Sequence, residues 1–442
     1  MNWKHLALAL PLSCCLGISV PLAAPSVKIN STAVIVNEAI DADIESKLKA
    51  GVTASQFTLS KASDADLAKL CELFPGMTSL RVQNGKRITN LAPLAALGKL
   101  KRLELDCQAK DLTPLSGLIG LETLAVTAPM ANTAWMEKLT SLKAIKLNSG
   151  ELTSLKGLPN LPTLRYLTIY SARPDDLTPI VEAMPNLQSL TLNSVLLPDL
   201  TPLTRLAKLE DLSFYGSQVK DFSILAGCPK LKKFDYYATK GADYSTLAKL
   251  TKLEELQGGL TKLNDISWIT SLPNLKKFTL FSEYVKDYTP LAKTKLEYLK
   301  IWSMHEPVDL VPVGQISTLK ELVFWSVEHV SGSKALSGLT SLEKLTINDY
   351  NVKQGGEHFD LAAASGWKNL KEFTTKNTTF DNFANMAACT ALQSVTLTKT
   401  QGITSLAPLK QLPALKYVRL TKGLFPDAEL QGFGPKVRIS QQ

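Results

Sequence analysis

Aromatic side chains recur at one fixed place in a repeating apolar pattern. In segments such as Leu187-x-x-Leu190-x-Leu192, apolar and polar residues alternate, which predicts a strand with one buried face. The residue after the last apolar position then lies on the open face. In eight consecutive repeats, six of these residues are aromatic, although the whole chain is 7% aromatic. They are Tyr170, Tyr215, Tyr237, Phe281, Trp302 and Trp325.

Further residues that could bind a ligand lie on the same predicted face. Tyr166 and Tyr298 are nearer the start of their strands. The flanking charged residues are Asp211, Lys233, Asp235, Glu255, Lys277, Lys300 and Glu321. With strands about 4.8 Å apart, the aromatic residues would form a row roughly 35–40 Å long. Such a patch favours partner binding, with the aromatic residues and Lys300 in contact. The alternative is that the aromatic residues only stabilise the sheet by packing between strands.

Residues for catalysis or metal binding are sparse. Of the three histidines after the N-terminal segment, His305, His329 and His358, none has the spacing of a metal-binding motif. The sequence has no phosphate-binding glycine loop, no nucleophile elbow and no related cysteine–histidine pair. It therefore predicts no enzyme, no cofactor and no metal. The net charge of +9 is spread over the turns, so we also expect no nucleic-acid partner.

A repeat of about 22 residues sets the framework for these side chains. Successive strand motifs are 21 to 23 residues apart, except for the longer step from Leu345 to Phe373. Their central apolar residues are Phe57, Leu80, Leu103, Leu124, Ile145, Leu167, Leu190, Leu212, Phe234, Leu256, Phe278, Leu299, Leu322, Leu345, Phe373, Val395 and Val418. A fixed period of this length predicts a solenoid with one continuous core.

The second half of each repeat advances in steps of three, as in Leu91, Leu94, Leu97 and Leu100. This spacing fits 3-10 turns better than α-helix. The predicted fold class is thus an α/β solenoid, a leucine-rich-repeat horseshoe with a parallel concave β-sheet and a convex side mostly of 3-10 turns.

The repeats resemble those of a known family. The strand pattern followed by Leu-Thr-Pro-Leu-Ser-Gly-Leu, residues 112–118, is similar to the 22-residue repeats of bacterial internalins. The resemblance covers residues 55–424 and implies the fold. Those repeats usually carry Asn three residues after the last strand leucine. Here that position holds residues such as Gly150, Ala172, Val327 and Thr400, so the chain is a divergent member whose partners cannot be transferred from the family.

The ends of the chain predict export and capping. Residues 1–24 have the form of a signal peptide: Lys4 and His5, an apolar run, then Ala23 and Ala24. A lipoprotein signal at Cys14 or Cys15 is the alternative. We expect an N-terminal cap over residues 25–54, about 17 repeats over 55–424 with an insertion near 350–366, and a C-terminal cap over 425–442.

Four cysteines follow the predicted signal: Cys71, Cys107, Cys228 and Cys389. Their repeats are too far apart, or their sides too different, for disulfide geometry, so free core thiols are expected. The combined prediction is an exported, monomeric leucine-rich-repeat protein, periplasmic, surface-held or secreted, without a transmembrane segment in the mature chain. It would engage a protein partner through its aromatic face; the alternative is a glycan-binding module of the cell envelope.

Overall fold

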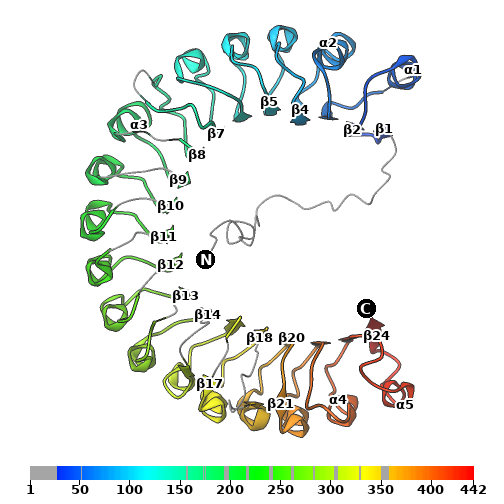
Figure 1. Cartoon of the computed structure of the whole chain (residues 1–442), viewed down its shortest axis with the longest axis vertical. Coiled ribbons are helices and arrows are strands. Elements are labelled where there is room, and N and C mark those ends of the chain that lie inside the picture. The colour runs from blue at the N-terminus through cyan, green and yellow to red at the C-terminus, as the bar shows by residue number, and fades with distance from the viewer. Residues whose placement is uncertain are drawn as a thin grey trace, which may run out of the picture. The chain divides into compact units, whose positions relative to one another are not determined.

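The computed structural model describes residues 27–50, 52–155, 158–172, 174, 176–193, 199–215, 219–237, 242–259, 263–281, 284–302, 307–327, 330–349 and 358–442. The predicted signal peptide lies outside these residues, as do His305 and His329. The chain divides into two compact units, one ending at Leu121 and one running from Glu122 to Gln442. Each unit is built from the same coil, a strand followed by a turn (Figure 1).

The first unit begins with an antiparallel strand that the apolar pattern did not predict. Its elements are β1 (Val27–Ile29), β2 (Ala33–Val36), α1 (Ala42–Lys49), β3 (Gln56–Ser60), α2 (Asp64–Leu73), β4 (Ser79–Gly85), η2 (Ala92–Ala96), β5 (Arg102–Cys107) and η3 (Thr113–Gly117). β1 runs antiparallel to β2, and β2 to β5 pair in parallel in chain order. β2 and α1 lie within residues 25–54, where we expect the N-terminal cap.

One buried carboxylate joins the start of this unit to its first repeats. Asp66 accepts hydrogen bonds from the Ile40 backbone N–H at 2.7 Å and from the Ser63 hydroxyl at 2.6 Å. Burial works to raise its pKa, but these hydrogen bonds hold the pKa of Asp66 below its ordinary value. The same Ser63–Asp66 pair forms a capping box at the start of α2, which fixes where the helix begins.

The second unit carries most of the repeats. Its elements are β6 (Thr123–Thr127), η4 (Ala134–Met136), β7 (Ala144–Asn148), β8 (Tyr166–Tyr170), α3 (Thr178–Ala183), β9 (Ser189–Asn193), η5 (Thr201–Arg205), β10 (Asp211–Tyr215), η6 (Ser223–Gly227), β11 (Lys233–Tyr237), η7 (Tyr244–Lys249), β12 (Glu255–Gly259), η8 (Ser267–Ser271), β13 (Lys277–Phe281), η9 (Thr289–Lys293), β14 (Tyr298–Trp302), β15 (Val308–Asp309), η10 (Val313–Gln315), β16 (Glu321–Trp325), β17 (Val330–Ser331), η11 (Ser333–Gly338), β18 (Lys344–Asn348), β19 (Phe359–Asp360), η12 (Leu361–Gly366), β20 (Glu372–Lys376), β21 (Phe380–Asp381), η13 (Phe383–Ala388), β22 (Ser394–Thr398), α4 (Ala407–Lys410), β23 (Tyr417–Leu420), α5 (Asp427–Leu430) and β24 (Arg438–Gln441).

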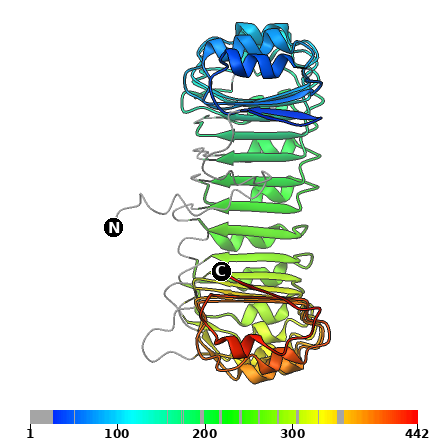
Figure 2. The ribbon, with the colours of Figure 1, turned by 90° about the vertical axis from the view of Figure 1, so that its right-hand side faces the viewer.

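The strands occur at the places in the repeat where the apolar pattern predicts them. All seventeen predicted strand positions lie in strands, and within each unit neighbouring ones pair in parallel register, as in Leu212 with Phe234 and Phe234 with Leu256. In the second unit the successive strands point the same way (Figure 2). They line the inner side of the coil and the 3-10 turns line its outer side (Figure 1). One 22-residue period is thus one coil, and the predicted parallel-sheet solenoid is confirmed.

The outer side departs from 3-10 geometry in a few repeats, where α2 and α3 are α-helices. Before most of the 3-10 turns stands an Asp or Asn whose side chain accepts the backbone N–H two residues on. These hydrogen bonds run from Thr113 to Asp111 at 2.9 Å, from Thr201 to Asp199 at 2.8 Å and from Ser267 to Asp265 at 2.7 Å. Such Asx turns fix the direction in which the chain leaves the strand. The sequence analysis did not identify this recurring aspartate.

Residues with left-handed backbone conformation lie at the ends of several strands. Ser171, Ser326, Asp349 and Asn377 have φ between 51° and 58°. Each donates its backbone N–H to a carbonyl of the next strand, as Ser171 does to Asn193 at 2.9 Å and Asn377 to Thr398 at 2.8 Å. The ladder therefore extends one residue past these strands, which satisfies backbone groups that would otherwise be unpaired.

Three further predictions concern the insertion, the C-terminal end and the cysteines. Residues 350–357 of the predicted insertion lie outside the described residues, whereas its second half forms β19 and η12. Phe359 of β19 pairs in register with Phe380 of β21, so this half belongs to the regular coil. Ile439 of β24, within the residues expected as the C-terminal cap, pairs with Val418 of β23. The four cysteines after residue 26 are buried and free, as predicted.

Candidate binding face of the second unit

The strand register of the second unit arranges its open face in three rows. The first, third and fifth residue of each strand lie on this face, because the second and fourth are buried, as in Asp211–Tyr215. The fifth-residue row contains Tyr170, Asn193, Tyr215, Tyr237, Gly259, Phe281, Trp302, Trp325 and Asn348. Pairing places Tyr215 beside Tyr237, and Phe281 beside Trp302. The predicted aromatic residues therefore occupy one row, which we call the aromatic row.

Two side chains of the aromatic row pack directly on each other. The ring centroids of Phe281 and Trp302 are 4.1 Å apart, and their planes meet at 87°. Such edge-to-face packing fits the charge distribution of aromatic rings. The indole N–H of Trp302 is buried and has no hydrogen-bond partner among the described residues. Gly259 places no side chain beside Phe281, so the row is interrupted there.

Lysines lie over two other rings of the row. The Lys300 ammonium is 5.0 Å from the centroid of Trp325, and that of Lys146 is 5.0 Å from the centroid of Tyr170. Both distances are in the range of cation–π attraction. Trp325 is nevertheless 41% exposed. It therefore keeps a large apolar surface in contact with solvent.

The two tyrosines predicted at strand starts lie in the first-residue row. Tyr166 begins β8 and is 53% exposed, whereas Tyr298 begins β14 and is half-buried. Burial, with Glu321 nearby, raises the pKa of Tyr298 above its ordinary value. The backbone of Tyr237 is in register, but its side chain lies outside the described part of the chain. Tyr166 and Tyr298 thus share the sheet face with the aromatic row but lie in a different row.

Most of the flanking charges compensate one another across strands. Glu255 on β12 pairs with Lys233 on β11 at 3.1 Å and with Lys277 on β13 at 2.9 Å. Burial works to raise the pKa of Glu255, but the two lysines hold it below its ordinary value. One residue earlier, Lys232 and Glu254 form another cross-strand pair at 3.2 Å. These charges stabilise strand pairing and register in the way that opposite cross-strand pairs do.

Asp235 lacks such compensation. It is the third residue of β11, and its register neighbours are the uncharged Ser213 and Gln257. The Tyr215 hydroxyl donates to its Oδ2 at 2.7 Å, while Oδ1 is buried with no hydrogen-bond partner among the described residues. Burial raises the pKa of Asp235 to about 6, because the single Tyr215 hydrogen bond does not offset desolvation and Asp211 adds repulsion.

Lys300 is the corresponding cation on β14. Its register neighbours in the third-residue row are Thr279 and Val323, neither of which carries a charge. Desolvation lowers the pKa of Lys300, and no carboxylate within the described residues forms an ion pair with it. From β8 to β22, Asp235 and Lys300 are the only charged residues in this row of described strand positions.

A depression of about 240 Å³ opens at the anionic end of the face. Its lining residues are Asp211, Ser213, Lys233, Phe234, Asp235, Glu255 and Gln257. Burial raises the pKa of Asp211 as well, although Lys233 attracts it. The depression is therefore walled by two poorly solvated carboxylates, beside the ring of Tyr215.

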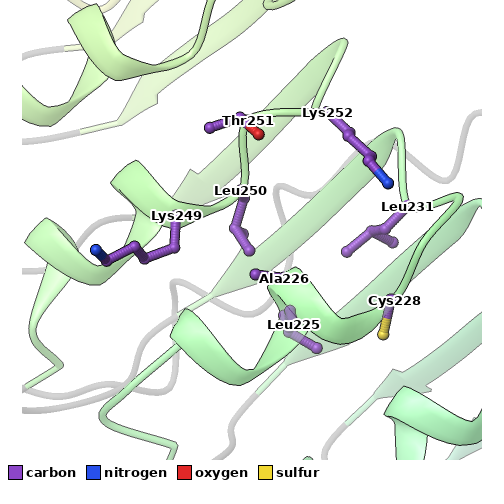
Figure 3. A pocket seen from close by; sticks show the side chains of 8 residues that line it. All are labelled: Leu225, Ala226, Cys228, Leu231, Lys249, Leu250, Thr251 and Lys252. Carbon is purple, nitrogen blue, oxygen red and sulfur yellow. The ribbon is translucent and has the colours of Figure 1, made fainter.

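Two further hollows lie away from this face. One of about 420 Å³ in the first unit is lined by strand residues that include Arg81, which pairs with Glu104 at 2.7 Å. The other holds about 40 Å³ on the outer side of the second unit, between successive turns (Figure 3). It lies among Leu225, Leu231 and Leu250, with Lys249 extending away from them (Figure 3). A space of this size suits about one water molecule.

Metal and nucleophile chemistry find little support. No group of three potential metal-ligating side chains occurs in the described ranges. His358 contacts a single carboxylate, with its Nδ1 3.1 Å from Asp381. Burial raises the pKa of the Cys228 thiol to about 11, which keeps it protonated and unreactive. No helix that the structure describes is long and apolar enough to cross a membrane.

Comparison with solved structures agrees with this architecture. TLR13 in its complex with ssRNA13 is 16% identical, with 94% of this chain and 70% of that chain covered and a TM-score of 0.62. The chain has the leucine-rich-repeat fold. A leucine-rich-repeat protein of Leptospira interrogans is 16% identical, with 91% and 92% covered and a TM-score of 0.49.

An internalin of Listeria monocytogenes is 20% identical to this leucine-rich-repeat chain, with 86% of this chain and 95% of that chain covered and a TM-score of 0.41. No protein-family model matches the chain, and the search of curated proteins gave no match. The leucine-rich-repeat fold that the resemblance implied is confirmed by the order of strands and turns and by the likeness to TLR13. The leucine-rich-repeat assignment does not by itself identify a partner.

Proposed function

We propose that this leucine-rich-repeat protein binds a protein partner through the aromatic row of its second unit. The observation that carries the proposal is the register that brings Tyr215, Tyr237, Phe281 and Trp302 into one row on an open sheet face. Large, rigid aromatic side chains contribute much of the binding energy of protein interfaces at little cost in conformational entropy.

Exposure and polarity support this assignment. Trp325 and Tyr166 present large apolar surfaces to solvent, which sheet stability alone does not require. The indole N–H of Trp302, which has no acceptor among the described residues, also favours a ligand acceptor at this position. Binding would then consist of desolvation of the rings of Phe281, Trp302 and Trp325, with Lys300 and the tyrosines Tyr166, Tyr170 and Tyr298 in contact around them.

The proposal includes a location and a role. The form of residues 1–24 supports export of the protein, to the periplasm, the cell surface or the medium. Repeat proteins commonly use their extended faces for binding, which supports a binding role. The proposal is of a non-enzymatic monomer without a cofactor. Nucleic acid is not the expected partner, because the face carries charges of both signs.

A glycan of the cell envelope is the second candidate. Aromatic rings beside hydroxyl and carboxylate groups, as at Tyr215 and Asp235, suit stacking on a sugar ring and hydrogen bonding to its hydroxyls. A glycan array with the purified chain separates the two candidates. Selective sugar binding that is lost in the Trp302→Ala, Trp325→Ala variant would favour the glycan.

A comparative pull-down tests the protein-binding proposal. The full chain without residues 1–24 is immobilised beside the Trp302→Ala, Trp325→Ala variant and a Tyr417→Ala control. Tyr417 is 51% exposed, somewhat more than Trp325 at 41%, but it lies in the first-residue row of β23. A specific partner should be retained by the wild type and the control and lost by the double variant. Equal retention by all three would refute the proposal, provided that circular dichroism shows each variant folded.

A further inference from the structure

The charged residues of the binding face divide into compensated and uncompensated groups. Lys233, Glu255 and Lys277 neutralise one another across three strands. Asp235 and Lys300 occupy the third-residue row, where the residues paired directly with them on the neighbouring strands are uncharged. Partial burial of a charge without a counter-ion opposite it costs stability, so two such positions in one row favour a partner outside the chain.

The spacing of the two residues is set by the sheet. Asp235 lies on β11 and Lys300 on β14, three strand steps apart, which corresponds to about 14 Å at the usual strand spacing. An extended peptide advances about 3.3 Å per residue, so side chains four residues apart span nearly the same distance. Residues four apart also lie on the same side of an extended segment. An extended segment could therefore meet both charges at once.

The surface between the two charges can admit such a segment. Gln257 and Thr279, the intervening residues of the row, are uncharged and offer hydrogen-bonding groups. Gly259 leaves the aromatic row without a side chain beside Phe281. At the anionic end, the 240 Å³ depression lined by Asp211 and Asp235 has room for a side-chain cation.

Extending the proposed function, on which this inference rests, we propose that the partner presents an extended segment carrying a basic and an acidic residue four positions apart. The basic side chain enters the depression beside Asp211 and Asp235, next to the ring of Tyr215. The acidic side chain pairs with Lys300 near Trp325. The face thus selects an extended segment by its charge spacing, while the aromatic row supplies the apolar contact.

The electrostatics of the free protein fit this arrangement. Desolvation raises the pKa of Asp235 and lowers that of Lys300, so each charge is destabilised in the absence of a counter-ion. An incoming ion pair would reverse both effects. Charge-assisted hydrogen bonds in such a partly desolvated place are stronger than those on an open surface.

Synthetic peptides provide the test. The probes are fluorescein-labelled, eleven-residue Ser/Thr-rich peptides with one arginine and one glutamate separated by two to six positions, in both orders. Peptides with arginine only, glutamate only or two arginines serve as controls. The full chain should bind best at a separation of four, by fivefold or more over separations of two and six, in one or both orders.

Variants assign the selectivity to the two charges. Asp235→Asn, which can still accept from Tyr215, should remove the advantage of arginine, and Lys300→Met should remove that of glutamate. Lys300→Glu should shift the preference to the peptide with two arginines. Arg419→Met, which changes the charged third residue of β23, should leave the selectivity unchanged. Equal binding of all peptides, no binding by the wild type, or unchanged selectivity in the variants would overturn the inference.

The aromatic variant separates this inference from the proposed function. If Trp302→Ala, Trp325→Ala abolishes peptide binding but the charge variants change nothing, the charge-spacing inference fails and the aromatic row stands. If the charge variants act as expected but the aromatic variant binds the peptides like the wild type, the binding role proposed for the aromatic row is wrong. The pull-down with the same aromatic variant tests the proposed function separately, so that function can be assessed even when no peptide binds.

Discussion

Phe281 and Trp302 meet edge to face across two neighbouring strands, with ring centroids 4.1 Å apart. The contact joins the fifth residues of β13 and β14, which register pairing places directly opposite each other. It orders Trp302 before any partner arrives, so less conformational entropy is lost on binding.

We expect Phe281→Ala to destabilise the protein by about 1–3 kcal/mol, since it removes an aromatic pair and part of its buried area. Urea unfolding followed by circular dichroism measures this loss. Phe281→Leu, which keeps most of the apolar volume, should recover part of the stability but not the ring contact. A Phe281→Ala variant as stable as the wild type would show that the pair has no structural role.

Asp235→Asn should stabilise the protein at neutral pH. The folded-state pKa of Asp235 is about 6, above the ordinary value of 3.8, so the folded state binds the proton more tightly than the unfolded state. The cost of the charged form is therefore absent well below pH 4, grows as pH rises and is complete above about pH 7. A shift of this size corresponds to on the order of 1–3 kcal/mol.

Thermal unfolding of the wild type and of Asp235→Asn from pH 4 to 8 measures this difference. The gain from Asn should shrink steadily as pH falls, because Asp235 becomes protonated. The charged groups around it, Asp211, Lys233 and Glu255, remain in both proteins, and the Tyr215 hydroxyl can donate to Asn as well. A gain independent of pH, or a loss at pH 8, would contradict the assigned titration.

The Asx turns should make the solenoid sensitive to acid. Hydrogen bonds from Thr201 hold the pKa of Asp199 below its ordinary value. The stabilisation is thus present above the unfolded-state pKa and is lost as pH falls through the lower folded-state pKa. Asp199→Ala should cost roughly 0.5–1 kcal/mol at pH 7, as loss of a capping acceptor does. Asp199→Asn should retain most of this stability and lose its pH dependence, which melting curves at pH 3 and pH 7 can show.

The buried cysteines should resist modification in the native protein. Burial raises the pKa of Cys71 and Cys389 to about 12 and that of Cys107 to about 11. At pH 8 almost no thiolate forms, so a thiol reagent should label the chain from residue 25 only after unfolding, and then at four sites. Fewer than four thiols in denaturant without a reductant would indicate a disulfide that the structure does not contain.

The fold could be predicted from the sequence because the spacing of its leucines corresponds to one coil per repeat. Each predicted strand position, from Phe57 to Val418, lies in a strand. Side chains of a strand alternate between its two faces, so alternating apolar residues determine which face is buried. β1 escaped prediction because its three residues are largely exposed and it pairs antiparallel outside the repeat. The Asx turns escaped it because the leucine period says nothing about the polar residues that stand between the apolar positions.

The candidate site was only partly accessible from the sequence. Spacing placed Phe281 and Trp302 in one row, but only the register and the ion pairs separated the compensated Glu255 from the uncompensated Asp235. Charge compensation depends on which side chains meet across strands and on how deeply each is buried. A list of charged residues contains neither property.

The affinity of the partner isolated by pull-down is the most direct measure of the central claim. Titration calorimetry with the wild-type chain, Trp302→Ala, Trp325→Ala and Tyr417→Ala compares the aromatic row with an exposed tyrosine outside it. We predict that the double variant binds at least tenfold more weakly than the wild type, while Tyr417→Ala binds within twofold. A folded double variant with wild-type affinity would contradict the proposal that the aromatic row is the binding site.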